Sequence, residues 1–282
     1  MTIGVFDSGS GGLTIMRALD KAFPDRPFIY LGDHANAPYG KKSADEIYAL
    51  TIQNVERLFT MGCGLVIIAC NTAAARGLRK LQREWLPHYY PERRVLGVIV
   101  PVVEEMTGML WTPDQEPIDR VHDRDDLHVA VFATQHTVES GAFSSEIHKR
   151  APHIQVTEQA CPNLVDLIEN NASETLLRNA VKDYVDALYK KVPGQKLDMC
   201  ILACTHYPLI EDIFCRALPA GTRILSQPDI TSKSLVSYLE RHPELKGETG
   251  DTRLFLTTGN TQQASLIASR FYGHVVDFEL AQ

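Results

Sequence analysis

The feature that most constrains this chain is an apolar stretch that ends in a cysteine, and it occurs twice. Residues 65–72 read LVIIACNT, and residues 199–206 read MCILACTH, so that Cys70 and Cys204 occupy the same place in the two stretches. Aliphatic runs without alternation are typical of strands buried on both faces of a parallel sheet. Ligands of open α/β sheets bind outside the carboxyl ends of the strands. The pattern therefore predicts Cys70 and Cys204 at ligand-binding edges, one in each half of the chain.

A buried cysteine also has a plainer explanation, since free cysteine often packs as a small hydrophobic residue. One such cysteine would say little about catalysis. Two in the same setting, each followed by hydrogen-bonding side chains, favour a functional pair. Asn71 and Thr72 can cap the helix expected after Cys70. A helix N-terminus lowers the pKa of a nearby thiol, which gives Cys70 a route to thiolate character.

Composition restricts the class of protein. A chain of 282 residues with 44% hydrophobic residues suits one large or two ordinary globular domains. A formal net charge of -7 argues against nucleic-acid binding. The sequence holds neither an apolar run that could cross a bilayer nor an N-terminal signal segment. We therefore expect a cytoplasmic protein with reduced cysteines and no membrane partner. The absence of a Cys-x-x-Cys pair argues against a zinc ribbon or dithiol motif, and we assign no metal site.

Strand and helix patterns alternate along most of the chain. Besides the two cysteine strands, strands are expected at residues 2–6, 28–31, 95–100, 129–133, 154–157, 223–225, 254–257 and 275–278. This alternation indicates doubly wound, mainly parallel sheets. We predict an α/β protein of two domains related by pseudo-symmetry, with residues 1–98 and 208–282 in a discontinuous first domain and residues 99–207 in the second. The acidic stretch 111–128 is interpreted as a solvated insertion or long loop.

Two further loops follow predicted strands. The loop after the first strand begins with Asp7 and is rich in glycine, but its spacing fits neither the dinucleotide fingerprint nor the P-loop. A plain strand-to-helix turn would explain the glycines, whereas the Asp7 carboxylate is a good acceptor for an ammonium group. The loop that contains Tyr39 and Gly40 can equally be an ordinary surface turn. Ser43 and Glu46 beyond it are spaced as a capping box.

These motifs together resemble the aspartate/glutamate racemase family of pyridoxal-phosphate-independent enzymes, and within it the glutamate racemases. The principal matches are Asp7-Ser8-Gly9-x-Gly11-Gly12-Leu13, Pro38-Tyr39-Gly40, Cys70-Asn71-Thr72-Ala73 and Cys204-Thr205-His206-Tyr207-Pro208. Weaker matches are Thr134-x-x-Thr137-x-x-Ser140, Cys161-Pro162 and Thr257-Thr258-Gly259. Each motif alone is modest, but together they follow the family order over nearly the whole chain. The stretch 111–128 departs from compact members of the family.

The resemblance implies a role for each matching residue. Cys70 and Cys204 would exchange the α-proton, with Asp7, His206 and Glu169 as supporting catalytic groups. The residues that would hold the substrate are Asp7, Ser8, Tyr39, Gly40, Asn71, Thr72, Thr134, Thr137, Thr205 and His206. The resemblance further implies an active site between the two domains, interconversion of L- and D-glutamate without a cofactor, and supply of D-glutamate for peptidoglycan synthesis in cell-wall biogenesis.

The chemistry of the residues agrees with this role. Inverting an α-carbon requires a base on one face and an acid on the other, and two similar residues from two pseudo-symmetric halves can supply them. Three alternatives remain open from the residues alone. One is a racemase of another acidic amino acid such as aspartate, and another is a cofactor-free decarboxylase, which would need only one of the cysteines. The third is an amino-acid binding or regulatory protein, which would need neither. The sequence also leaves a homodimer open.

Overall fold

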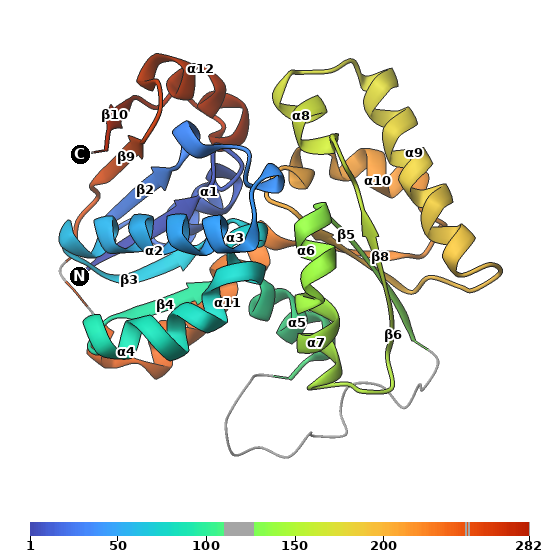
Figure 1. Cartoon of the computed structure of the whole chain (residues 1–282), viewed down its shortest axis with the longest axis horizontal. Helices are drawn as coiled ribbons and strands as arrows, with labels where there is room; N and C mark the ends of the chain where they lie inside the picture. Colours follow the sequence, from blue (N-terminus) through green and yellow to red (C-terminus); the bar gives the residue numbers. More distant parts are fainter. Residues whose placement is uncertain (110–126, 246, 248, 282) are drawn as a thin grey trace. The chain divides into compact units, whose positions relative to one another are not determined.

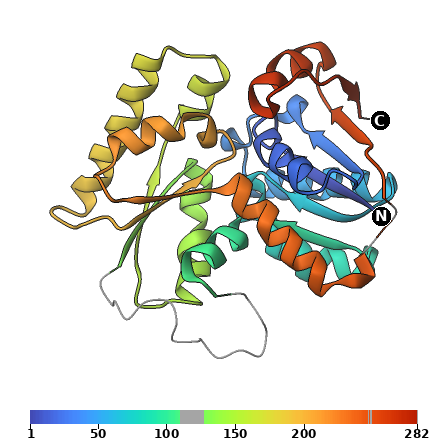
Figure 2. The same cartoon turned by 180° about the vertical axis from the view of Figure 1, so that it is seen from behind.

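The computed structural model describes residues 1–109, 127–245, 247 and 249–281 of the chain. Most of the acidic stretch that was predicted as an insertion therefore lies outside the described residues. The chain divides into two compact units, Met1–Val98 with Pro228–Gln282, and Ile99–Gln227. Figures 1 and 2 show the elements of both units from opposite sides.

The first unit contains a parallel six-stranded sheet. Its strands, in spatial order, are β10 (Phe278–Leu280), β9 (Arg253–Thr257), β2 (Phe28–Gly32), β1 (Thr2–Asp7), β3 (Cys63–Ile68) and β4 (Arg94–Gly97). The neighbouring strands β1, β2 and β3 are almost completely buried. Figure 1 shows α2 across the front of this sheet, and Figure 2 shows α1 on the opposite face. Helices on both faces explain why these strands carry unbroken apolar runs.

Helices of the first unit connect these parallel strands. They are α1 (Leu13–Ala22), α2 (Ala44–Thr60), α3 (Asn71–Ala73), α4 (Leu86–Tyr89), α11 (Gln227–Arg241) and α12 (Thr261–Tyr272). Shorter turns are η1 (His34–Asn36), η2 (Tyr39–Lys41) and η6 (Pro243–Leu245), and the stretches η3 (Ala74–Leu78) and η4 (Leu81–Trp85) are π-helical. The predicted capping box at the start of α2 is confirmed. The Glu46 side chain accepts the backbone N–H of Ser43 at 2.8 Å, and Ser43 Oγ accepts that of Glu46 at 3.3 Å.

The second unit contains a smaller parallel sheet. Its strands, in spatial order, are β6 (Gln155–Ala160), β5 (His128–Ala133), β7 (Met199–Ala203) and β8 (Arg223–Ser226). Its helices are α5 (Ile99–Thr107), α6 (Gln135–Ser140), α7 (Ala142–His148), α8 (Leu164–Glu169), α9 (Glu174–Lys191), η5 (Tyr207–Ile210) and α10 (Glu211–Ala217). The order β6-β5-β7-β8 repeats the order β2-β1-β3-β4 of the first sheet. The predicted α/β class is confirmed, and β3 and β7, which precede the two cysteines, occupy corresponding positions.

Three predicted boundaries were wrong. The return to the first unit was placed at residue 208, but β8 pairs in parallel with β7, so residues 208–227 belong to the second unit. The strand expected at residues 95–100 ends at Gly97, and Pro101 lies in the first turn of α5, where a missing N–H costs no helical hydrogen bond. The last strand begins at Phe278 instead of residue 275.

Candidate active site

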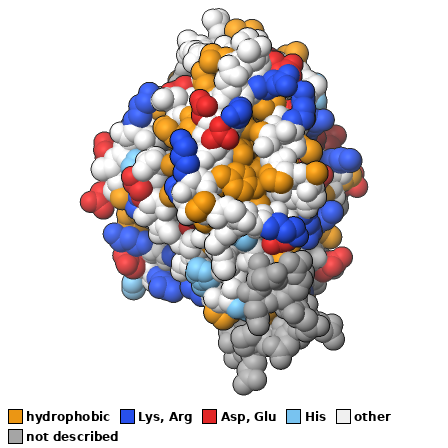
Figure 3. All heavy atoms as spheres, turned by 90° about the vertical axis from the view of Figure 1, so that its right-hand side faces the viewer, with side chains coloured by type: hydrophobic (Ala, Val, Ile, Leu, Met, Phe, Trp, Pro, Cys, Tyr) orange, Lys and Arg blue, Asp and Glu red, His pale blue; other side chains and the backbone are white. Residues whose placement is uncertain are grey.

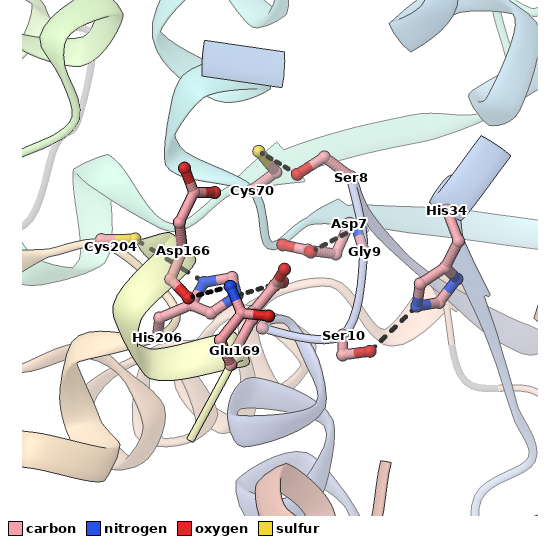
Figure 4. Close-up of polar contacts among 12 residues, drawn as sticks. Asp7, Ser8, Gly9, Ser10, His34, Cys70, Asp166, Glu169, Cys204 and His206 are labelled. Carbon is pink, nitrogen blue, oxygen red and sulfur yellow. Dashed lines mark hydrogen bonds and ion pairs between the residues drawn. The ribbon is translucent and has the colours of Figure 1, made fainter. Parts of the chain in front are cut away.

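The first group of predicted site residues gathers at the carboxyl edge of the six-stranded sheet. Strands β1 and β3 are adjacent and parallel, and the backbone N–H of Ala69 donates to the carbonyl of Phe6 at 2.8 Å. This pairing brings the loop after β1 beside the end of β3. The Cys70 thiol donates to the Ser8 hydroxyl at 3.3 Å, as Figure 4 shows.

The sulfur of Cys70 also caps the helix that follows it. Its Sγ atom accepts the backbone N–H of Ala73 at 3.5 Å, in the place usually taken by a serine or aspartate oxygen. The residue is 5% exposed. Peptide dipoles at the start of a helix favour negative charge, so this environment suits a thiolate. Asn71 and Thr72, which follow directly, are both buried.

Asp7 is held by the loop that it begins. The residue is 0% exposed, and its Oδ1 atom accepts the backbone N–H of Gly9 at 2.8 Å. Gly12 packs closely against it, because a Cβ atom at Gly12 would lie 2.5 Å from Asp7 Cβ. The glycine-rich loop thus allows the helix start to approach the Asp7 side chain.

The loop that carries Tyr39 and Gly40 is more than a surface turn. Gly40 is exposed, whereas Tyr39 is 2% exposed and its hydroxyl donates to Asp33 Oδ2 at 2.7 Å. Burial and the neighbouring Asp33 carboxylate raise the pKa of Tyr39, which therefore keeps its proton. Because the Tyr39 hydroxyl is committed to Asp33, a substrate contact from this segment would come from its backbone.

The second group of predicted site residues gathers at the carboxyl edge of the four-stranded sheet. Cys204 follows β7 and is 5% exposed. His206 Nδ1 lies 3.8 Å from Cys204 Sγ, and His206 Nε2 lies 2.8 Å from Oε1 of Glu169, the last residue of α8. Figure 4 shows the imidazole between the thiol and the carboxylate. A reactive thiol, a histidine and a carboxylate that orients the histidine form a recurrent arrangement for activating cysteine.

His206 is protonated in this arrangement. Burial alone would lower its pKa, but the contacts with Cys204 and Glu169 outweigh burial and raise the pKa from 6.5 to about 10. At neutral pH an imidazolium therefore lies beside Cys204.

Three threonines complete the second group. Thr134 follows β5 and caps α6, where its Oγ1 atom accepts the backbone N–H of Thr137 at 3.4 Å and lies 3.0 Å from Thr137 Oγ1. Strands β5 and β7 are adjacent, so Thr134 and Cys204 follow neighbouring strand ends. Thr205 is buried between Cys204 and His206.

Two residues of the first unit, Asp33 and Asn54, were missed by the sequence analysis. Asp33 follows the apolar strand β2, is 0% exposed, and accepts hydrogen bonds from Asn54 at 3.0 Å and from Thr258 at 2.6 Å. A signal for Asp33 existed, since it is a polar residue directly after an apolar run. Asn54 lies within the amphipathic helix α2, where a buried amide has no distinguishing pattern.

The other buried cysteines are Cys63, Cys161 and Cys200. Burial raises the pKa of Cys63 to about 12, and it raises the pKa of Cys161 and Cys200 further. These three are structural thiols that stay protonated.

Other kinds of site find little support in the described part of the chain. Among those residues we find no cluster of His, Cys, Asp and Glu side chains that could hold a metal ion. The helices described there are also too short or too polar to cross a membrane. Figure 3 shows basic and acidic side chains interspersed on the face at the right of Figure 1. That face therefore lacks the continuous basic surface typical of nucleic-acid binding.

Comparison with individual known proteins identifies the family, although no family model matches the chain. The glutamate racemase of Roseobacter denitrificans is 47% identical over 282 residues, and the match covers all of both chains. A solved glutamate racemase isoform of Bacillus anthracis has a TM-score of 0.86 at 28% identity, covering 100% of this chain and 97% of the other. The glutamate racemase of Francisella tularensis, solved in complex with D-glutamate, has a TM-score of 0.83 at 27% identity and the same coverage.

These full-length matches agree with the two cysteine strands and with the order of the motifs. They separate the chain from the amino-acid binding protein and the decarboxylase that the residues alone left open. The chain belongs to the glutamate racemase family, whose members are cofactor-independent isomerases.

Proposed function

We propose that Cys70 and Cys204 are the two acid/base residues with which this chain interconverts L- and D-glutamate. Family membership gives the reaction, and one observation carries the assignment of these residues. The two cysteines follow corresponding strands of two sheets with the same strand order, and each contacts a different activating partner. Duplicated positions of this kind suit a reaction that needs one proton-transfer group on each face of an α-carbon.

The proposed mechanism is a pair of proton transfers. With L-glutamate, the Cys204 thiolate removes the α-proton and the Cys70 thiol donates its proton to the opposite face, leaving a Cys204 thiol and a Cys70 thiolate. With D-glutamate the same steps run in reverse. The mechanism requires both sulfurs to reach one substrate from opposite sides, and the sequence-based expectation of a shared pocket stays a prediction.

The remaining predicted residues support one cysteine or the other. Ser8 and Asp7 accompany Cys70, and His206 with Glu169 accompanies Cys204. The residues proposed to hold the substrate carboxylates and ammonium group are Asp7, Ser8, Tyr39, Gly40, Asn71, Thr72, Thr134, Thr137, Thr205 and His206. Hydroxyls and backbone N–H groups at helix starts can bind carboxylates without a basic cluster.

The D-glutamate product serves peptidoglycan synthesis, as in the family. We place the reaction in the cytoplasm, where the reducing conditions that the two catalytic thiols need are maintained. A homodimer is a further proposal, and light scattering of the pure protein tests it.

An exchange experiment in heavy water tests the function. The pure protein is incubated with L- or D-glutamate, while optical rotation and the α-proton signal are followed. In the first turnovers the product enantiomer should carry deuterium at Cα, while the remaining substrate keeps protium, because separate groups remove and deliver the proton. Cys70→Ala and Cys204→Ala should abolish racemisation, and Cys215→Ser, at an exposed thiol, should leave it unchanged. Faster racemisation of aspartate than of glutamate would overturn the substrate assignment.

A further inference from the structure

A buried carboxylate outside the proposed proton-transfer chemistry lies at the end of β2. Asp33 is completely buried, and four side chains donate to it. Its Oδ1 atom accepts from Asn36 Nδ2 at 2.9 Å and from Thr258 Oγ1 at 2.6 Å. Its Oδ2 atom accepts from the Tyr39 hydroxyl at 2.7 Å and from Asn54 Nδ2 at 3.0 Å. A single carboxylate therefore ties its own loop to α2 and to the loop after β9.

Each carboxylate oxygen of Asp33 faces two hydrogen-bond donors, so both oxygens must act as acceptors. An ionised carboxylate accepts about four hydrogen bonds, which is the number found here. The Asn54 amide also donates to the carbonyl of Leu50 at 2.9 Å, so it cannot turn round to offer its oxygen without losing a bond. Asp33 is thus matched to its partners by charge and by shape.

The neighbour of Asp33, His34, extends these connections to the loop after β1 and adds a second contact at the end of β9. His34 Nε2 lies 2.9 Å from the Ser10 hydroxyl in the loop after β1, and His34 Nδ1 lies 2.9 Å from Thr257 Oγ1 at the end of β9. Gly259 lies so close that a Cβ atom there would be 2.9 Å from His34 Cβ. The motif Thr257-Thr258-Gly259, only a weak match in the sequence, therefore contacts the Asp33–His34 pair.

We infer that Asp33 is a positioning residue for substrate binding, which acts by fixing the segment that contains Tyr39 and Gly40. The inference rests on the proposed function, which assigns this segment to the substrate. The segment is tied down through the Tyr39 hydroxyl, and that hydroxyl is held by Asp33. Thr258 holds the other oxygen of the same carboxylate, so the C-terminal part of the chain helps to set the segment's position.

The substitution Asp33→Asn tests this role because it keeps the size of the side chain. In one orientation the new amide group faces the Asn54 amide, and in the other it faces the Asn36 amide, so two donors oppose each other either way. We expect KM to rise about tenfold for both enantiomers, while kcat changes much less. Tyr39→Phe, which removes one donor, should raise KM in the same direction by a smaller factor.

A second substitution provides a rescue. In Asp33→Asn/Asn36→Asp the donor and acceptor of one pair are exchanged, so the new amide at 33 can donate to the new carboxylate at 36. In this double variant KM should fall part of the way back to the wild-type value. Asn36→Asp alone should not lower KM below that of wild type.

A matched control lies at the opposite end of the same sheet. Asp20 accepts a hydrogen bond from the Tyr272 hydroxyl at 3.0 Å and pairs with Arg253, the first residue of β9. Asp20→Asn and Tyr272→Phe therefore alter the same kinds of contact away from the carboxyl ends of the strands. They should lower Tm while leaving KM for glutamate unchanged.

The outcomes separate this inference from the proposed function. If wild-type protein does not racemise glutamate, the proposed function fails. If wild type is active, a raised KM in Asp33→Asn with rescue by the exchanged pair supports the inference. Three results would overturn the inference and leave the proposed function standing. They are an unchanged KM in Asp33→Asn, a loss in that variant confined to kcat and Tm, and an equal rise of KM in Asp20→Asn.

Discussion

His206 Nδ1 lies 3.8 Å from Cys204 Sγ, whereas the Cys70 thiol donates to the Ser8 hydroxyl at 3.3 Å. The two corresponding cysteines therefore have different surroundings. Cys204 faces an imidazolium that a carboxylate supports, and Cys70 faces a hydroxyl and the start of a helix. Changes to one set of partners should affect one direction of proton removal more than the other.

Replacing His206 by Asn should slow removal of the α-proton of L-glutamate on the order of 10²-fold, because the Cys204 thiolate loses its positive neighbour. The step can be measured as release of the α-proton from each enantiomer under single-turnover conditions. Removal of the D-glutamate proton should change less, since Cys70 keeps Ser8. Equal slowing of both steps would contradict the assignment of His206 to Cys204.

His206 should also make stability depend on pH. Its pKa is raised from 6.5 to about 10 in the folded protein, so the folded state binds the proton more tightly than the unfolded state does. The resulting stabilisation is fully present below pH about 6.5, decreases as pH rises, and is lost above pH about 10. The difference in Tm between wild type and His206→Asn should shrink over this interval. A difference that stays constant would show that His206 does not hold the extra proton.

Glu169→Gln should move the alkaline limit of L-glutamate turnover to lower pH. The Glu169 carboxylate helps to raise the pKa of His206, and a neutral amide would let that pKa fall. A pH profile of kcat in the L-to-D direction measures the shift. Glu174→Gln, at an exposed carboxylate that pairs with Arg178 in α9, is the matched control and should leave the profile in place.

Asp7→Asn should separate the role of charge from the role of shape. The amide oxygen of Asn can still accept the Gly9 N–H, so Tm should change little. Loss of the negative charge should lower kcat/KM on the order of tenfold, because the buried carboxylate no longer binds the substrate ammonium or accepts a proton. Since the two enantiomers have equal free energies, kcat/KM must fall equally in both directions. Full activity of Asp7→Asn would show that Asp7 is not one of the catalytic residues.

Local patterns predicted the parts of the fold that depend on local burial. The unbroken apolar runs before Cys70 and Cys204 identified central strands, and Ser43 with Glu46 identified a helix start. The strand-end position of both cysteines followed from the geometry of parallel sheets. None of these predictions needed knowledge of distant contacts.

Features that depend on distant pairing could not be predicted in this way. The return at residue 208 was wrong because β8 is short and only its pairing with β7 assigns it to the second sheet. The environment of Asp33 was missed for a similar reason, since its partner Thr258 is 225 positions away in the chain. A loop with turn residues around Pro38 gave no sign that Tyr39 is buried.

Elimination from each enantiomer of a glutamate that carries chlorine at Cβ tests the two-cysteine assignment most directly. Only the first proton transfer is needed, because chloride then leaves and the resulting enamine hydrolyses to ammonia and a measurable 2-oxo acid. Cys70→Ser keeps the Cys204 base and should process the L-analogue, whereas Cys204→Ser keeps the Cys70 base and should process the D-analogue. The double variant should process neither. If both single variants process the same enantiomer, Cys70 and Cys204 are not the two opposing bases.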